Sequence, residues 1–215
     1  MGLIKIMVLV SGGGTNLQAL LKAEQNGELL PGRLAVVVSD RPETKATEDV
    51  KLWDIPVYVE EPNSSLKKNE KRRELSDRIY RIAIKHNVRL IVLAGFLSIL
   101  SGKILKSYAG RIINLHPSLL PKYGGEGMYG ERVHKAVLDA GDKFTGCTVH
   151  IVDEGVDTGP IVLLRRIPVN KGDTPYSLAN RVHAEEHIAI VTAARLMSKQ
   201  IQNQMKIIAA NLQQS

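Results

Sequence analysis

Two polar side chains, Asn114 and His116, follow a short apolar segment and stand two positions apart. On an extended strand, residues i and i+2 point to the same side, so the amide and the imidazole would face one space. Both groups can donate hydrogen bonds to an oxygen that becomes negative when a carbonyl carbon is attacked. The pair therefore indicates acyl-transfer chemistry, to which Asp157 in a downstream turn would add a remote carboxylate.

The nearest hydroxyl, Ser118, is a poor candidate for a covalent nucleophile. It lies between Pro117 and Leu119 and lacks the Gly-x-Ser-x-Gly turn that exposes a nucleophilic serine. We therefore expect transfer without an acyl-enzyme. Spacing alone leaves two other interpretations open: His116 as a packed core histidine, and Asp157 as a turn residue with a purely conformational role.

A glycine-rich segment, Ser-Gly-Gly-Gly-Thr-Asn at residues 11–16, follows the first apolar run and precedes the first helical pattern. Backbone N–H groups and the helix dipole make such a turn a site for an anion. Leu17 stands where a dinucleotide fingerprint has its third glycine, and no Lys-Ser/Thr pair completes a P-loop. We favour a phosphate monoester over a dinucleotide, although Asp40 after the second apolar run keeps a ribose contact open.

Two further histidines, His183 and His187, stand four residues apart in the last helical pattern. Ala184 occupies the glutamate position of a His-Glu-x-x-His zinc motif and no third ligand is evident, so we expect no metal. Glu186 is a better candidate for contact with a substrate amine or hydroxyl. His150 alternates with apolar neighbours, which favours packing or support of the site.

The composition fits one α/β domain spanning residues 1–215, because 44% hydrophobic residues in 215 supply an ordinary core. No apolar run approaches the ~20 residues of a membrane span. The run at residues 3–10 is too short for a secretory signal and continues directly into the glycine-rich turn, so we expect a cytoplasmic protein without membrane contact. The single cysteine, Cys147, lies in a strand-like segment and is expected to be packed and unreactive.

The formal net charge is +7, with an isoelectric point near 9.5. Basic residues are scattered, and their richest cluster lies at residues 67–73. Aromatic residues make up only 4% of the chain, so no ladder of rings is available to stack bases. This pattern favours a small anionic substrate, or a solvated helix face, over nucleic acid.

The elements that must hold these groups can be read from alternating patterns. Short apolar runs occur at residues 4–10, 34–39, 57–59, 90–94 and 112–115. Helical patterns lie between most of them, at residues 16–25, 69–87 and 96–108. Such alternation predicts a Rossmann-like, mainly parallel sheet flanked by helices, whose strand ends would carry the glycine turn and the Asn-x-His pair.

The pattern changes after Pro121. Residues 122–130 are glycine-rich and are expected to form a mobile lid or binding loop. A helix is predicted at 131–140, and strand-like segments at 145–152 and 161–169 are expected to pair antiparallel. Thr174 would cap a final helix that begins at Pro175 and continues to about residue 204. The pattern does not decide whether His134 is more than a surface residue.

With these segments assembled, the chain resembles the phosphoribosylglycinamide formyltransferases, a branch of the folate-dependent formyltransferase family. The resemblance runs from residue 4 to the final helix. It is carried by SGGGTNLQAL at 11–20, VLAGFLSIL at 92–100, YAGRIINLHPSLLP at 108–121 and DEGVDTGP at 153–160. The wider family shares the Asn-x-His pair and the downstream Asp, and the N-terminal loop narrows the resemblance to this branch.

The resemblance implies a transferase of purine biosynthesis that moves the formyl group of 10-formyltetrahydrofolate, a cosubstrate, to the amine of phosphoribosylglycinamide. Its catalytic residues would be Asn114, His116 and Asp157. Asn114 and a protonated His116 would stabilise the oxyanion. Asp157 would raise the pKa of His116 and relay a proton through water.

The same resemblance implies two binding sites. The ribonucleotide would be held by Gly14, Thr15, Asn16, His183, Ala184, Glu185 and Glu186. The folate pocket would comprise Arg73, Leu97, Ser98, Ile99, Leu100, Asn114, Asp153, Glu154, Gly155, Val156 and Asp157. An N-terminal half, about 1–110, would hold the phosphate, and a second half, about 111–205, would supply the folate site and the catalytic residues.

The chain departs from the family pattern at Ser98, often arginine, at His183, often glutamine, and in the stretch 124–130. Rival interpretations are formyltetrahydrofolate hydrolase, a formyltransferase for another amine, methionyl-tRNA formyltransferase and a non-catalytic nucleotide-sensing module. The hydrolase family carries a preceding regulatory domain and the tRNA enzyme a binding tail, whereas the first strand is expected here at Ile4. Monomer and homodimer both stay open.

Overall fold

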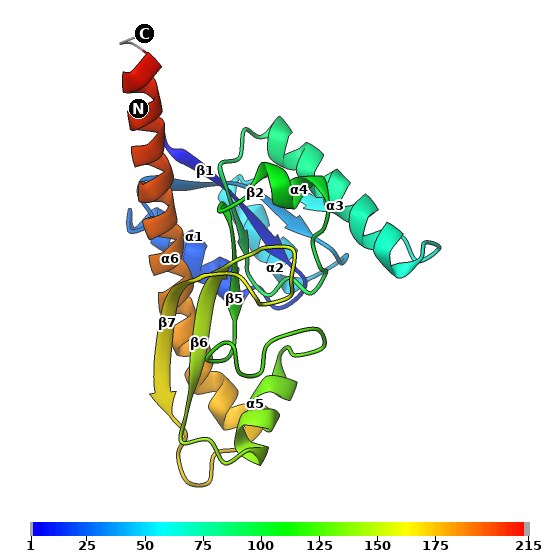
Figure 1. The fold of residues 1–215 in the computed structure, drawn as a ribbon, viewed down its shortest axis with the longest axis vertical. Helices are drawn as coiled ribbons and strands as arrows, with labels where there is room; N and C mark the ends of the chain where they lie inside the picture. Colours follow the sequence, from blue (N-terminus) through cyan, green and yellow to red (C-terminus); the bar gives the residue numbers. More distant parts are fainter. Residues whose placement is uncertain (1, 213–215) are drawn as a thin grey trace.

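The computed structural model describes residues 2–212, apart from the side chains of residues 49 and 52. Seven strands form one sheet in the order β3-β2-β1-β4-β5-β6-β7 (Figure 1). Their bounds are β1 Ile4–Val10, β2 Gly32–Ser39, β3 Val57–Val59, β4 Leu90–Leu93, β5 Ile112–His116, β6 Phe144–Ile151 and β7 Ile161–Pro168. The pairings among β1 to β5 are parallel, whereas β6 pairs antiparallel with both β5 and β7. The predicted mainly parallel sheet with an antiparallel end is confirmed.

Helices cover both faces of this sheet (Figure 1). Their bounds are α1 Thr15–Gln25, α2 Lys45–Val50, η1 Lys51–Trp53, α3 Lys68–Lys85, α4 Lys103–Ser107, α5 Glu131–Asp139 and α6 Pro175–Leu212. The strand β1 shows how the sheet separates two cores: Ile6 and Val8 pack in the cluster that contains α1 and α6 residues. Met7 and Leu9 pack in the cluster that contains α3 and α4 residues. Because β1 is covered on both faces, nearly all of its residues are apolar, which explains the continuous apolar run in the sequence.

The helix expected at 96–108 was wrong for most of its length, because only Lys103–Ser107 is helical. Gly95 and Gly102, at either end of the irregular part, both have positive φ angles. Between them, the Leu97 N–H donates to Ser11 Oγ at 2.8 Å and the Ser101 N–H donates to Ser76 Oγ at 2.9 Å. Neighbouring elements thus satisfy backbone donors that a helix would satisfy internally, and the segment becomes a loop at the sheet edge.

The final helix begins as predicted and ends later. Ser177 N–H donates to Thr174 Oγ1 at 3.1 Å, and Thr174 N–H donates to Ser177 Oγ at 2.9 Å, so Thr174 caps the helix reciprocally. The helix continues to Leu212 rather than ending near residue 204, and its last turns extend past the sheet (Figure 1). Among the described helices, none has the length and apolar character required to cross a bilayer.

Candidate active site

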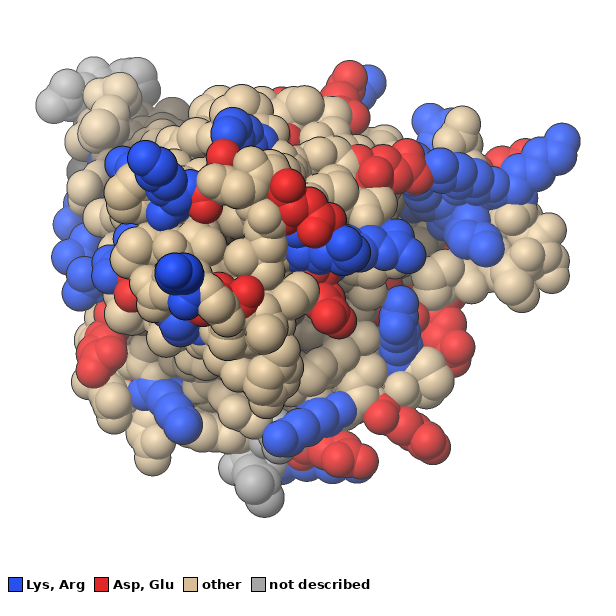
Figure 2. All heavy atoms as spheres, turned by 90° about the horizontal axis from the view of Figure 1, so that it is seen from below, with Lys and Arg blue, Asp and Glu red and all other residues tan. Residues whose placement is uncertain are grey.

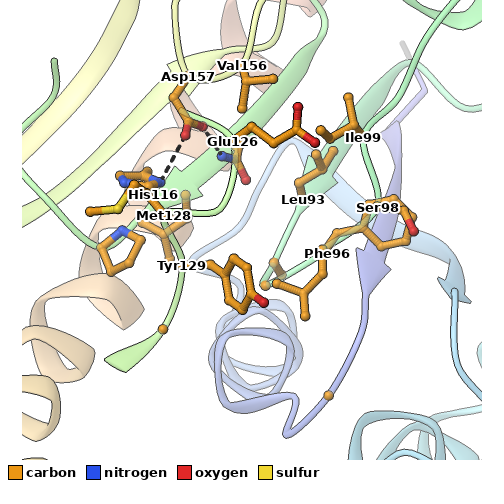
Figure 3. Close-up of a pocket in the computed structure, with 18 of the residues that line it drawn as sticks. Leu93, Phe96, Ser98, Ile99, His116, Glu126, Met128, Tyr129, Val156 and Asp157 are labelled. Atoms are coloured by element: carbon orange, nitrogen blue, oxygen red, sulfur yellow. Dashed lines mark hydrogen bonds and ion pairs between the residues drawn. The ribbon is translucent and has the colours of Figure 1, made fainter. Parts of the chain in front are cut away.

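A cleft of about 980 Å³ lies at the carboxyl ends of β1, β4 and β5. Its walls combine the glycine turn before α1, the loop after β4, the end of β5, the glycine-rich stretch, the β6–β7 loop and one face of α6. Figure 3 shows Leu93, Phe96 and Ile99 as an apolar wall facing Met128 and Tyr129 across the space. Ligands bind at this edge of α/β sheets because the helix starts and loop backbones converge there.

Most of the residues singled out from the sequence line this cleft. They are Gly14, Thr15, Asn16, Leu97, Ser98, Ile99, Leu100, Asn114, His116, Asp153, Gly155, Val156, Asp157, His183 and Glu186. Four do not line it: Arg73, Glu154, Ala184 and Glu185. Glu185 instead pairs with Arg165 on β7, and the preceding residue in α3, Arg72, lines the cleft in place of Arg73.

The strand pairing brings Asn114, His116 and Asp157 together. Asn114 on β5 lies opposite His150 on β6, and His116 lies opposite Thr148. The Asn114 amide donates to Asp157 Oδ1 at 3.3 Å and to His150 Nε2 at 3.1 Å. His116 Nδ1 faces Asp157 Oδ2 across 3.4 Å (Figure 3). The amide, imidazole and carboxylate predicted from the sequence therefore share one wall of the cleft.

Asp157 is held as a carboxylate by its surroundings. Burial alone would raise its pKa, but the His150 and His116 imidazoles and the Gly125 N–H, which donates to Oδ2 at 3.0 Å, together lower it below the usual value. The Gly125 contact also ties the glycine-rich stretch to this carboxylate. No regular helix or strand forms over residues 124–130, as expected from the sequence.

The net effect on His116 is opposite to the expected one. Its pKa lies below the ordinary value, because burial of the ring outweighs the attraction of the Asp157 carboxylate and the hydrogen bond to the Tyr123 carbonyl. The Asp157 carboxylate does favour the imidazolium, as expected, but its effect on the His116 pKa is smaller than the effect of burial. The neutral imidazole is consequently the resting form near pH 7.

Three residues considered for other chemistry are held in structural contacts. Ser118 is fully buried and donates to the Lys122 carbonyl at 2.6 Å, so its hydroxyl is not presented to the cleft. Burial raises the pKa of the Cys147 thiol to about 12, which keeps it protonated. Asp40 is buried outside the cleft lining, and its Oδ2 accepts a hydrogen bond from Ser98 Oγ at 2.6 Å, so its carboxylate is not presented to the cleft as a ribose contact would require.

The glycine turn and α6 meet at the other end of the cleft. Gly14 precedes α1 with φ 71°, and no side chain caps this helix start. Asn16 donates to Glu186 Oε2 at 3.1 Å, which ties the first turn of α1 to α6. Burial raises the pKa of Glu186, against the influence of His183 and Asn16. Exposed backbone donors beside this polar pair suit an anionic, hydroxyl-bearing ligand.

Sequence reasoning missed several lining residues. Glu126 pairs with Lys68 at 2.5 Å and with Arg72 at 2.8 Å, so the glycine-rich stretch reaches across to α3. The basic run at 67–73, visible as a concentration of blue side chains where α3 projects (Figure 2), was the feature of the sequence that could have indicated this contact.

His134 is buried rather than superficial, and burial lowers its pKa to about 4. Among the described residues, no group of three or more potential ligands could hold a metal ion.

Comparisons with known proteins agree with this architecture. A model of the formyl transferase family matches residues 4–194. The phosphoribosylglycinamide formyltransferase of Bacillus subtilis is 36% identical over 185 residues, covering 85% of this chain and 89% of that protein. The trifunctional purine biosynthetic protein adenosine-3 of Chironomus tentans is 38% identical over 90% of this chain, which spans only 14% of the insect protein. The crystal structure of glycinamide ribonucleotide transformylase 1 from Symbiobacterium toebii superposes with a TM-score of 0.82 at 38% identity, covering 92% of this chain and 89% of that one.

Proposed function

The chain belongs to the formyl transferase family, and on that premise we propose that it transfers the formyl group of 10-formyltetrahydrofolate to the amine of phosphoribosylglycinamide in purine biosynthesis. The observation that carries the proposal is the meeting of Asn114, His116 and Asp157 in one cleft with an uncapped helix start. The first three groups suit acyl transfer, and the helix start suits the phosphate of the acceptor.

The reaction begins with attack of the acceptor amine on the formyl carbon. The resulting oxyanion lies within reach of the Asn114 amide, which exchanges its hydrogen bond to Asp157 or His150 for one to the oxyanion. Such a donor lowers the barrier by about 3 kcal/mol. Neutral His116 accepts the proton that the attacking nitrogen loses, and the Asp157 carboxylate stabilises the imidazolium that forms. Collapse of the tetrahedral intermediate then breaks the bond between the formyl carbon and N10 of the folate, and N10 takes the proton back from His116 as tetrahydrofolate leaves. No covalent intermediate with Ser118 or Cys147 is required.

The two ends of the cleft suit the two substrates. The glycine turn, Asn16, His183 and Glu186 surround the end where a ribonucleotide phosphate and hydroxyls would bind. Leu93, Phe96, Ile99 and Val156 provide an apolar wall for the planar ring system of a reduced folate (Figure 3). Arg72 and Lys68 at the mouth suit the carboxylates of its glutamate tail.

The proposal is tested by a formyl-transfer assay with purified protein, 10-formyltetrahydrofolate and phosphoribosylglycinamide, in which tetrahydrofolate release is followed with and without the ribonucleotide. Release that requires the ribonucleotide, and that is lost in His116→Ala and Asp157→Asn, is the expected result. Release without any acceptor would instead identify a formyltetrahydrofolate hydrolase. If tetrahydrofolate is released only when a different amine is supplied, that amine is the acceptor in place of phosphoribosylglycinamide. No release with any acceptor would contradict enzymatic formyl transfer.

We further propose that the reaction takes place in the cytoplasm. It would use the reduced folate as a cosubstrate and would need neither a metal ion nor a nucleic-acid partner. The proposed chemistry is compatible with a monomer and with a homodimer. Sedimentation equilibrium would distinguish them, and fractionation of cells that express the tagged chain would test the location.

A further inference from the structure

We propose that Tyr123 is a positioning residue that fixes His116 as the Nε2–H tautomer and so leaves Nδ1 as the atom that exchanges a proton during formyl transfer. Tyr123 stands near the start of the glycine-rich stretch, directly before Gly124 and Gly125, on the turn that follows β5. The catalytic half of this inference rests on the proposed function. The structural half concerns the protein without substrates and can be tested separately.

The tautomer follows from the partner of each ring nitrogen. His116 Nε2 lies 2.7 Å from the Tyr123 carbonyl oxygen. A backbone carbonyl can only accept, so Nε2 must carry the hydrogen. Nδ1 faces Asp157 Oδ2 across 3.4 Å, which is too long for a strong hydrogen bond. In the neutral ring Nδ1 therefore has a free electron pair, and a protonated Nδ1 would gain a carboxylate partner.

The carbonyl of Tyr123 is held in place by its own side chain and its neighbours. Tyr123 adopts φ 58°, a left-handed conformation that a residue other than glycine keeps only when its surroundings impose it. Its hydroxyl donates to Asp142 Oδ2 at 2.9 Å, in the turn after α5. The preceding residue, Lys122, is anchored through its carbonyl, which accepts from Ser118 Oγ at 2.6 Å. The Ser118–Lys122 bond thus closes the turn on itself, and the Tyr123 hydroxyl fastens it to the segment after α5.

This arrangement gives a balanced proton path through one nitrogen. When the acceptor nitrogen bonds to the formyl carbon, the His116 Nδ1 electron pair takes the proton that this nitrogen releases. When the bond between the formyl carbon and N10 of the folate breaks, Nδ1–H returns the same proton to N10. The Nε2–H stays on the Tyr123 carbonyl throughout, so the ring neither flips nor changes its tautomer between turnovers.

Three other titratable groups face the His116 ring and affect its charge. Asp157, in the β6–β7 loop, stabilises the imidazolium. His150 on β6 and His134 on α5 oppose it when they are protonated. None of these groups determines which nitrogen of the neutral ring carries the hydrogen, because that choice follows from the Tyr123 carbonyl.

Nitrogen NMR of the protein labelled with ¹⁵N-histidine measures the tautomer directly, and His116→Gln identifies the His116 signals. In the wild-type protein above the His116 pKa, we expect a protonated Nε2 and an unprotonated Nδ1. Tyr123→Phe and Asp142→Ala should both introduce a population of the Nδ1–H tautomer. They should also lower kcat about 2- to 10-fold, the effect of one lost hydrogen bond, with KM values unchanged.

Asp139→Ala is the matched control, because Asp139 is a carboxylate at the end of α5 that pairs with Lys135 rather than with Tyr123. An Nδ1–H tautomer in the wild-type protein would overturn the proposal. If both Tyr123→Phe and Asp142→Ala keep the tautomer and the kcat of the wild-type protein, the role of Tyr123 would be overturned. If Tyr123→Phe does not fold, Asp142→Ala still tests the tether while leaving the ring in place. An Nε2–H tautomer in a protein without formyl transfer would remove the proposed function and leave the positioning role intact.

Discussion

The Asn114 amide nitrogen on β5 lies 3.1 Å from Nε2 of His150 on the antiparallel neighbour β6. His150 Nδ1 lies 2.9 Å from the Ile151 carbonyl, so Nδ1–H donates there and, in the neutral ring, Nε2 accepts from Asn114, while the same Nε2 lies 3.4 Å from Asp157 Oδ1. The second Asn114 amide hydrogen points to Asp157 Oδ1 at 3.3 Å. The orientation of the Asn114 amide is therefore set before substrates arrive, by a cross-strand pair and a loop carboxylate.

Replacing Asn114 by Ala should remove the oxyanion donor. We expect kcat to fall about 100-fold or more, which corresponds to about 3 kcal/mol, with little change in either KM, because the contact forms fully only in the transition state. Steady-state kinetics with both substrates would measure this. The matched comparison is His150→Gln, which keeps a polar partner for Asn114 and should lose less. Equal losses in the two variants would contradict a direct role for Asn114.

The pH dependence of the reaction should reveal neutral His116 as the active form. Its pKa is lowered, mainly by burial, so protonation occurs below the ordinary value of 6.5 and activity should fall only as the pH drops through that lower value. The acceptor amine also titrates, and the residual activity of His116→Gln supplies the reference profile. A wild-type rate that increases, relative to this reference, as the pH falls below 6.5 would show that the imidazolium is the required form.

His134 should make the protein less stable at mildly acidic pH. Its folded pKa is about 4 against 6.5 for the free group, so the unfolded chain binds a proton between these values and the folded protein does not. The stability is complete above pH 6.5 and falls as the pH decreases toward 4, by roughly 2 to 3 kcal/mol in total. Urea unfolding at pH 7.5 and pH 5 should show a smaller difference for His134→Gln than for the wild type.

Gly14 should tolerate no side chain. A Cβ there would lie 2.7 Å from the Ala46 Cα, and φ is +71°. Gly14→Ala should lower the free energy of unfolding by at least about 2 kcal/mol, because both the clash and the left-handed backbone penalise alanine. Gly12→Ala is the control, since a Cβ at Gly12 meets nothing within 4 Å. Equal unfolding free energies for the two variants would contradict this account.

The parts of the site that could be predicted are those carried by local sequence. Asn114 and His116 share a strand face by their spacing, and the glycine turn precedes α1 as its pattern indicated. The loop at 95–102 could not be predicted, because its backbone donors are satisfied by Ser11 and Ser76 from distant segments. The lowered pKa of His116 was also beyond the sequence, since it depends on how deeply the ring is buried.

Three further differences between the predicted and the observed site have geometric causes that the sequence does not show. Arg72 rather than Arg73 lines the cleft because one residue along a helix rotates the side chain by about 100°. Tyr123 gave no signal in the sequence, because its contribution is a backbone carbonyl whose direction depends on a positive φ angle. Asp40 looked like a ribose ligand from its place after β2, but its side chain is buried outside the cleft lining, with Oδ2 bonded to Ser98.

Glu126 should act as an internal competitor for the anionic end of the folate. Its carboxylate pairs with Lys68 and Arg72, which line the same cleft, and Figure 3 shows its side chain extending toward Ile99. Glu126→Gln should therefore lower KM for the folate donor about two- to fivefold at low salt, the modest effect expected of exposed charges, and the gain should shrink at high salt. Asp139→Asn, which neutralises a carboxylate outside the cleft, should leave KM unchanged. A higher KM in Glu126→Gln would show instead that Glu126 orders the glycine-rich stretch for binding.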